Sequence, residues 1–160
     1  MDDMAIRNVV TRGDALLAKK SRVVEKFDDR LHTLIDDMIE TMHKKEGVGI
    51  AAPQVGVLRR VVIVEPDPET TMTLVNPEIL ERSGAVEGME GCLSVPDVWG
   101  IVVRPDHVVV KAQDRDVREF QFSADGYAAR IVCHEVDHLD GVLFTDKAIR
   151  FVDPDADDGE

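Results

Sequence analysis

The stretch His134-Glu135-Val136-Asp137-His138 places two histidines four residues apart. If this stretch is helical, both imidazoles project from one face and can bind the same metal ion. Glu135 then lies beside the site without being a ligand. There a carboxylate can take a proton from an activated water molecule and deliver it to a leaving amine, as hydrolysis requires. The alternative is a surface helix with two solvent-exposed histidines, so the metal hypothesis needs a third ligand.

The third ligand is expected upstream of this motif. In zincin metallopeptidases it lies downstream of the second histidine, but only 22 residues follow His138 here, with no histidine and a single glutamate, Glu160. Cys92, in the stretch EGCLS (90–94), is the natural candidate, because a thiolate is a strong ligand for iron or zinc. Two histidines and one thiolate leave a fourth position open, which is typical of catalytic metal sites.

Cys133 is the other cysteine and a competing ligand. Because it is adjacent to His134, its side chain on a helix points roughly 100 degrees away from the ligand face. We therefore predict that Cys133 is a buried core residue. With only two cysteines in the chain, a disulfide framework is not expected.

Two helices are predicted to frame the chain. In the segment 28–45 apolar residues recur at spacings of three and four, which indicates an amphipathic N-terminal helix. The segment 127–139 carries the metal motif and has good helix formers, with Ser123 or Asp125 as the N-cap and Gly141 just past the end. The apolar stripe of the first helix comprises Leu31, Leu34, Ile35, Met38, Ile39 and Met42.

Strand-like runs lie between the two helices. Glycines, small residues and a proline in the segment 47–54 predict a close-packed loop. Short connections between successive strands favour antiparallel pairing. We therefore predict an α+β fold in which antiparallel β-sheets surround a C-terminal helix bearing the metal motif, with an amphipathic N-terminal helix. The predicted strands are 60–65, 72–75, 98–104, 108–113 and 118–122, with a turn at 114–116.

Composition indicates one domain and narrows the class of partner. With 160 residues, of which 44% are apolar, we expect a single catalytic domain over 1–150 and an acidic, disordered tail over 151–160. The net charge of −13 argues against direct sequence-specific nucleic acid binding. No apolar run is long enough to span a membrane and no secretory signal is present, so a cytoplasmic location is expected.

Three segments together are similar to the signature motifs of the peptide deformylase family. They are GVGIAAPQ (47–54), EGCLS (90–94) and HEVDH (134–138), in the family's order and at familiar separations. The likeness covers most of residues 5–148. It implies removal of the formyl group from the N-terminal formyl-methionine of newly synthesised proteins, releasing formate.

The resemblance also implies a role for each matching residue. One divalent metal ion is implied, Fe²⁺ foremost, with Zn²⁺, Ni²⁺ or Co²⁺ as substitutes. Gln54 and the backbone N–H of Leu93 would stabilise the formyl oxygen as it gains charge. Val48, Gly49 and Gly91 would lie along the substrate. Arg104 matches a position near the substrate or the metal-bearing loop. The implied metal ligands are Cys92, His134 and His138, and the implied acid/base is Glu135.

The resemblance makes nascent formyl-Met polypeptides the substrate and the ribosome a transient partner. Some deformylases contact the ribosome through a long basic C-terminal helix, whereas this chain ends in acidic residues. Another surface would therefore be needed, with Arg59 and Arg60 or Lys44 and Lys45 as candidates.

Several alternatives stay open from the sequence. The HExxH core alone would also fit a broader metallopeptidase, and a non-catalytic metal-binding module is compatible with the short acidic chain. Leu93, Val48 and Ile131 are candidate walls of a pocket for methionine. Trp99 fits either the rim of a cleft or the core.

Overall fold

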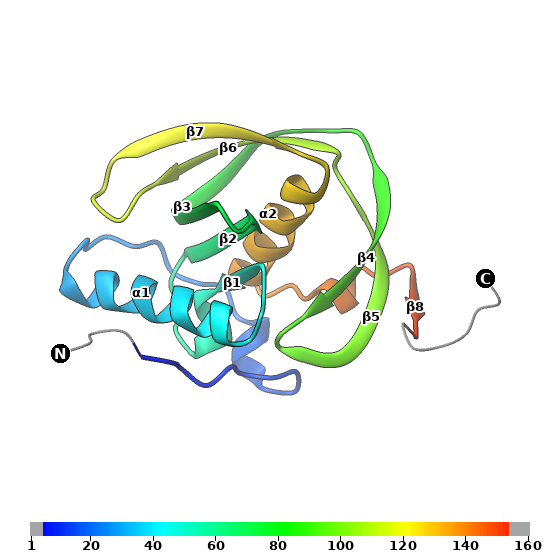
Figure 1. Ribbon diagram of the computed structural model, residues 1–160, viewed down its shortest axis with the longest axis horizontal. Helices are drawn as coiled ribbons and strands as arrows, with labels where there is room; N and C mark the ends of the chain where they lie inside the picture. The colour runs from blue at the N-terminus through cyan, green and yellow to red at the C-terminus, as the bar shows by residue number, and fades with distance from the viewer. Residues whose placement is uncertain (1–4, 154–160) are drawn as a thin grey trace.

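Two antiparallel sheets surround a central helix in the computed structural model, which describes residues 5–153 (Figure 1). The central helix is α2 (Gly126–Leu139). The larger sheet contains β1 (Gly49–Ala51), β2 (Val61–Asp67), β3 (Thr70–Ser83), β6 (His107–Gln113) and β7 (Glu119–Asp125), hydrogen-bonded in that order. The smaller sheet contains β4 (Val86–Cys92), β5 (Val95–Arg104) and β8 (Arg150–Val152). The predicted α+β class and the antiparallel sheets around the C-terminal helix are confirmed.

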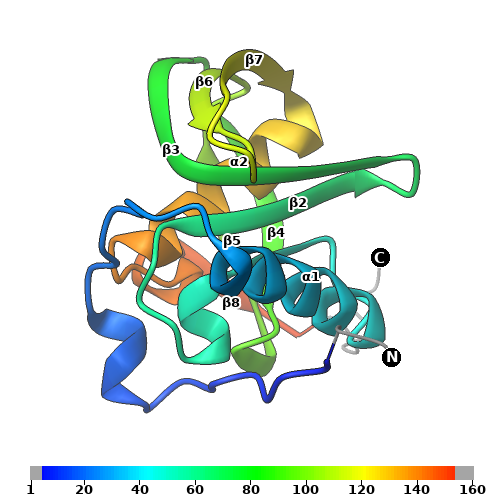
Figure 2. The same cartoon turned by 90° about the vertical axis from the view of Figure 1, so that its left-hand side faces the viewer.

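Strand β2 lies between two helices and is therefore apolar on both faces. Val62 and Val64 belong to the cluster that packs around α2, whereas Val61 and Ile63 belong to the cluster around α1 (Asp29–Lys44). Successive side chains of a strand point to opposite faces, so a strand covered on both sides reads as a continuous apolar run. Figure 2 shows α1 below β2, on the side away from α2.

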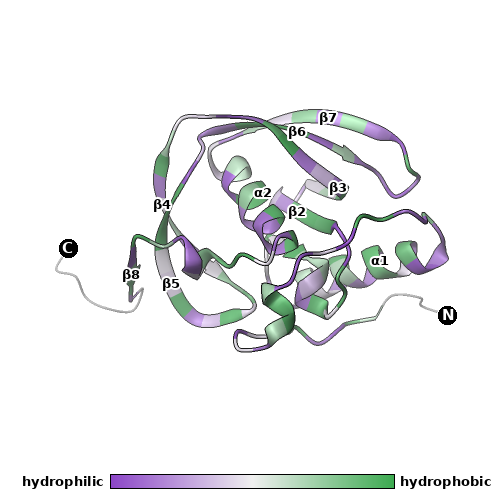
Figure 3. Ribbon diagram, turned by 180° about the vertical axis from the view of Figure 1, so that it is seen from behind, coloured by the Kyte–Doolittle hydropathy of each residue, from purple (hydrophilic) through white to green (hydrophobic). Residues whose placement is uncertain are grey.

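Helix α1 has one buried and one exposed face. Asp28 is its N-cap, and the Asp28 side chain accepts a hydrogen bond from the backbone N–H of Leu31 at 3.1 Å. Hydrophobic and hydrophilic residues alternate along the helix in Figure 3. The buried apolar face comprises Leu31, Leu34, Ile35, Met38 and Met42.

Helix α2 is almost enclosed, and its buried residues include His134, Glu135 and His138. Of the two predicted N-caps, Asp125 occupies the position, but its carboxylate lies 2.6 Å from Nδ1 of His107 and makes no capping hydrogen bond. Within residues 5–153 no helix is both long and apolar enough to span a membrane.

The observed elements differ from the expected ones in several places, and strand β3 extends well beyond the expected 72–75. The segment 47–54 contains strand β1 and most of a 3₁₀-helix, η2 (Ala52–Val55). Strand β4 was not predicted, because its sequence VEGMEGC contains two glycines, two glutamates and a single β-branched residue. Phe151 and Val152, expected in the tail, pair with β5 as part of β8, and residues 154–160 of that tail lie outside the described residues.

Candidate metal centre

Cys92, His134 and His138 come together where the β4–β5 hairpin meets α2. One ligand atom from each lies within 4.8 Å of the others, and Cys92 Sγ is 3.3 Å from His138 Nε2. The histidines are one turn apart on α2, as the spacing predicts. Cys92 is the last residue of β4, and the short turn that follows it returns the chain to β5, so the sulfur lies at the tip of the β4–β5 hairpin.

The chemistry of this donor set suits a divalent transition metal. One thiol and two imidazoles are the soft and borderline ligands that iron and zinc accept. Nδ1 of His134 lies 2.9 Å from Glu90 Oε1, so this nitrogen donates to the carboxylate and Nε2 remains for ligation. Burial lowers the pKa of His138 well below its ordinary value, which keeps that imidazole neutral, as a ligand must be.

Negative charge gathers around His134. Burial alone would lower its pKa, but hydrogen bonding to Cys92 and Glu90 and the charge of Glu135 raise the pKa to about 10. The negative groups that hold a proton on His134 also attract a divalent cation, which displaces that proton when it binds. The residues therefore fit the metal ion that the sequence implies.

Glu135 is 5% exposed and adjoins the ligand trio. Its Oε1 is buried and makes no hydrogen bond to any part of the chain that the structure describes. Burial raises the pKa of Glu135 to about 7. A carboxyl group with such a pKa can both take and release a proton near neutral pH. Its Oε2 faces Gly49, where a Cβ would lie only 2.5 Å away.

Gln54 is held in one orientation beside Cys92. Its Oε1 accepts a hydrogen bond from the backbone N–H of Ala51 at 2.9 Å, which fixes which end of the amide is the oxygen. Nε2 then donates to Ser94 Oγ at 3.1 Å and points to Cys92 Sγ at 3.5 Å. The side chain therefore presents N–H groups to the ligand trio, the property that an oxyanion donor needs.

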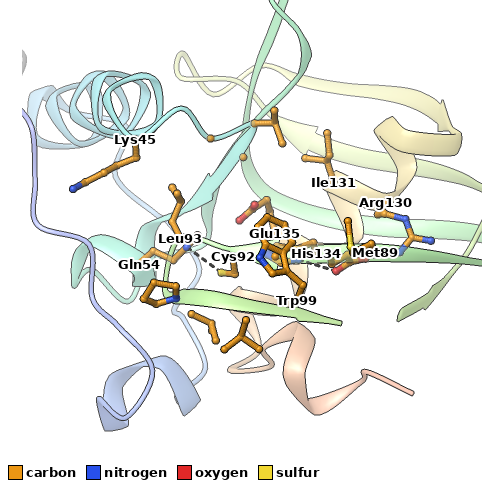
Figure 4. A pocket seen from close by; sticks show the side chains of 18 of the residues that line it. Lys45, Gln54, Met89, Cys92, Leu93, Trp99, Arg130, Ile131, His134 and Glu135 are labelled. Carbon is orange, nitrogen blue, oxygen red and sulfur yellow. Dashed lines mark hydrogen bonds and ion pairs between the residues drawn. The ribbon is translucent and has the colours of Figure 1, made fainter. Parts of the chain in front are cut away.

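A cavity of about 620 Å³ opens over Cys92 and His134 (Figure 4). Its walls include the expected Val48, Gly49, Gly91 and Leu93, together with Gln54, His134, Glu135 and Ile131. Trp99, which fitted two positions from sequence, lines the cavity and is 37% exposed. Gly91 allows the Trp99 indole to pack directly against the backbone, since a Cβ at position 91 would overlap Cζ3 of the ring.

The structure does not bring Arg104 to the cavity. Its side chain is 3% exposed and forms a two-bond ion pair with Glu90, at 2.9 Å for both Nε and Nη2, and a third bond to Asp137 at 2.6 Å. The expected contact with substrate is therefore not supported, whereas the alternative position near the metal-bearing loop agrees with the pair between Arg104 and Glu90 of the EGCLS segment. Glu90 is the partner that sequence reasoning missed, although it belongs to the EGCLS motif.

Known proteins are similar to this chain in both fold and sequence. A family model described as polypeptide deformylase matches residues 6–153. The peptide deformylase of Caldicellulosiruptor bescii is 58% identical over 149 residues, covering 93% of this chain and 89% of that protein. The crystal structure of the Thermotoga maritima peptide deformylase has a TM-score of 0.88 at 38% identity, covering 90% of this chain and 98% of that one. A peptide deformylase from Acinetobacter baumannii with bound Met-Ala-Ser has a TM-score of 0.85 at 40% identity, over 89% of this chain and 98% of that one.

The fold, the donor trio and the buried glutamate define a metal-dependent hydrolase. The chain belongs to the polypeptide deformylase family, whose members remove the N-formyl group from nascent peptides.

Proposed function

We propose that this chain hydrolyses the formyl group of N-terminal formyl-methionine in newly synthesised proteins, with Cys92, His134 and His138 as metal ligands and Glu135 as the acid/base. The observation that carries this assignment is the buried Oε1 of Glu135, which has no partner among the described residues and adjoins the donor trio. The bound Met-Ala-Ser of the Acinetobacter baumannii relative supports a formyl-Met peptide as the substrate class.

Fe²⁺ is the proposed metal, and Zn²⁺, Ni²⁺ or Co²⁺ are proposed substitutes. A thiolate with two imidazoles supports this group of ions, because hard cations such as Mg²⁺ prefer oxygen ligands. When bound, the ion supplies Lewis acidity to the formyl carbonyl and makes water a stronger nucleophile at neutral pH.

The chain's own residues divide the remaining work. Glu135 accepts the proton of the attacking water at Oε1 and returns it to the amide nitrogen, so the C–N bond breaks to give formate and a free amine. Gln54 Nε2 and the Leu93 N–H stabilise the oxygen of the formyl group as it becomes negative. Val48, Gly49 and Gly91 line the path of the substrate backbone. For the methionine side chain we propose an apolar wall that includes Ile131, because this residue lies in the same cavity.

Nascent polypeptides as substrates imply a cytoplasmic enzyme with transient access to the ribosome. Of the basic pairs considered for such contact, Arg60 is engaged within the fold, since its guanidinium donates to the carbonyls of Ser21 and Leu139 and pairs with Asp140. Lys44 and Lys45 are exposed and remain the better candidates for a docking surface.

The test is the release of formate from formyl-Met-Ala-Ser by anaerobically purified, iron-loaded protein. Removing the acid/base in Glu135→Ala should lower kcat by about 10²- to 10⁴-fold while the metal content stays that of the wild type. Cys92→Ala should lose metal as well as activity, because an anionic ligand is removed.

The matched control substrate is the same peptide without the formyl group. Cleavage of its internal bonds would instead support a broader metallopeptidase. An iron-loaded wild type that releases no formate would contradict the proposed reaction. Full activity in Glu135→Ala would contradict the proposed acid/base.

A further inference from the structure

Arg130 links the two elements that carry the metal ligands. It lies on α2 four residues before His134, so the two side chains share a face of the helix. Its own side chain is 12% exposed and lies at the edge of the cavity away from Lys45 (Figure 4). Arg130 lies outside the HEVDH motif, and the proposed reaction assigns it no role.

The guanidinium of Arg130 reaches both strands of the β4–β5 hairpin. Nη1 donates to Glu90 Oε2 on β4 at 2.6 Å and to the carbonyl of Val102 on β5 at 3.0 Å. Nη2 donates to the carbonyl of Val86, near the start of β4, at 2.8 Å. Only a planar group with several fixed donors can meet these acceptors at once, so lysine could satisfy part of the set but not all of it.

Space for this contact depends on Gly88. A Cβ at position 88 would lie 2.7 Å from Cζ and Nη2 of Arg130, closer than real Cβ atoms approach. β4 can therefore lie directly over the guanidinium only while residue 88 has no side chain. An alanine there would displace the flexible end of Arg130 and would remove no charge.

Two ion pairs connect α2 to the β4–β5 hairpin, and the arginine comes from the helix in one pair and from the hairpin in the other. Arg130 of α2 binds Glu90 of β4, and Arg104 of β5 binds Asp137 of α2. Both arginines also meet at the Glu90 carboxylate, whose Oε1 is bonded to His134. Each Glu90 oxygen thus has two donors, and a rotation of the carboxylate would break bonds on both elements.

We propose that Arg130 is a positioning residue for the metal ligands: it clamps the β4–β5 hairpin, which ends in Cys92, onto α2, and it fixes Glu90 and thereby the ring of His134. This inference rests on the proposed metal site and adds to it a residue that touches neither metal nor substrate. Groups that orient ligands in this way typically alter metal affinity by about 10- to 100-fold when they are removed.

The first measurement is Co²⁺ affinity and the Co²⁺ absorption spectrum of Arg130→Met, which keeps the length of the side chain and removes its donors. Affinity should fall by about 10- to 100-fold, and the thiolate-to-cobalt absorption should shift, because the sulfur is no longer held at the same place. For formyl-Met-Ala-Ser, kcat should fall while KM changes by less than about threefold.

Three further variants separate positioning from general stability. Arg130→Lys should recover part of the affinity lost in Arg130→Met, since it restores the charge and some donors. Gly88→Ala should shift the spectrum in the same direction as Arg130→Met, although every charged group is retained. Arg150→Met is the matched control, because the Arg150 side chain on β8 of the same sheet makes an exposed pair with Glu87 at 3.5 Å and no other ion pair within residues 5–153. Its Co²⁺ affinity should stay within about threefold of the wild type.

The proposal is overturned if Arg130→Met and Gly88→Ala both keep the wild-type spectrum and affinity, or if Arg150→Met changes them as much. If Arg130→Met does not fold, Gly88→Ala and Arg130→Lys decide by the same criteria. A failure of the metal site itself would be recognised separately, because Cys92→Ala would then leave the cobalt spectrum of the wild type unchanged.

Discussion

The Nδ1 atom of His134 lies 2.9 Å from Oε1 of Glu90, and this contact ties the metal motif of α2 to a strand 44 residues away in sequence. Glu90 is buried and forms ion pairs with Arg104 and Arg130. Burial alone would raise its pKa, but the hydrogen bonds from Arg104 and His134 outweigh burial and hold the pKa of Glu90 well below its usual range. The carboxylate therefore stays charged across the working pH and fixes which nitrogen of His134 carries a proton.

Glu90→Gln should lower the free energy of unfolding by about 3–5 kcal/mol, because two arginines lose a buried counter-charge. Urea unfolding of the metal-free protein measures this change. Glu87→Gln is the control, since Glu87 lies on the same strand but its pair with Arg150 is exposed. Equal stabilities of the two variants would contradict the role given to Glu90.

The stability difference between wild type and Glu90→Gln should also depend on pH. A carboxyl group whose pKa is depressed by folding stabilises the native state above its unfolded pKa, about 4.3 for glutamate, and loses that contribution as pH falls toward the folded value. The difference should therefore shrink below about pH 4, where the carboxyl group becomes protonated in the unfolded state. A difference that grows as pH falls from about 4 to 2 would contradict the ion-pair assignment.

Cys133→Ala should leave Co²⁺ affinity and the thiolate absorption unchanged, whereas Cys92→Ala should abolish the absorption. Cys133 is buried in the apolar cluster around α2, and this burial raises its pKa, so the thiol remains protonated and is a poor ligand. Loss of its sulfur should cost only on the order of 1 kcal/mol of unfolding free energy. If the absorption vanished in Cys133→Ala instead, the ligand assignment would be wrong.

Local patterns predicted the parts of the site that depend on short-range spacing. A helix alone places two histidines four residues apart on one face, and the same geometry turns the Cys133 side chain away from that face. Contacts between distant segments could not be read in this way. The position of Arg104, near the substrate or near the metal-bearing loop, stayed open because its partners Glu90 and Asp137 lie 14 and 33 residues away.

Arg130 did carry a signal that could have been used. It precedes His134 by four residues, so it must share the ligand face of the helix, where an unpaired arginine would be costly. Strand β4 had no comparable signal, because its pairing with β5 determines its conformation more than its glycines and glutamates do. The family motif identified Cys92, whereas the strand that carries it, β4, is recognised only from its pairing with β5.

Gly49→Ala should lower kcat through Glu135 and leave the metal in place. A Cβ at position 49 would lie 2.5 Å from Oε2 and 2.9 Å from Cγ of Glu135, so the carboxylate must move away from its present position. A displaced acid/base costs much of its catalytic contribution, and kcat should fall by at least about tenfold. Metal content should match that of the wild type, since the ligands are untouched.

A double-mutant cycle with Glu135→Ala shows whether Gly49→Ala acts through that carboxylate. If it does, adding Gly49→Ala to Glu135→Ala should reduce the residual rate by less than about threefold, because the clashing group is already gone. Independent effects would multiply instead, and the double variant would then be slower than Glu135→Ala by the full factor seen in the wild-type background. That result would assign the loss to the substrate path along β1, where Gly49 also lines the cavity.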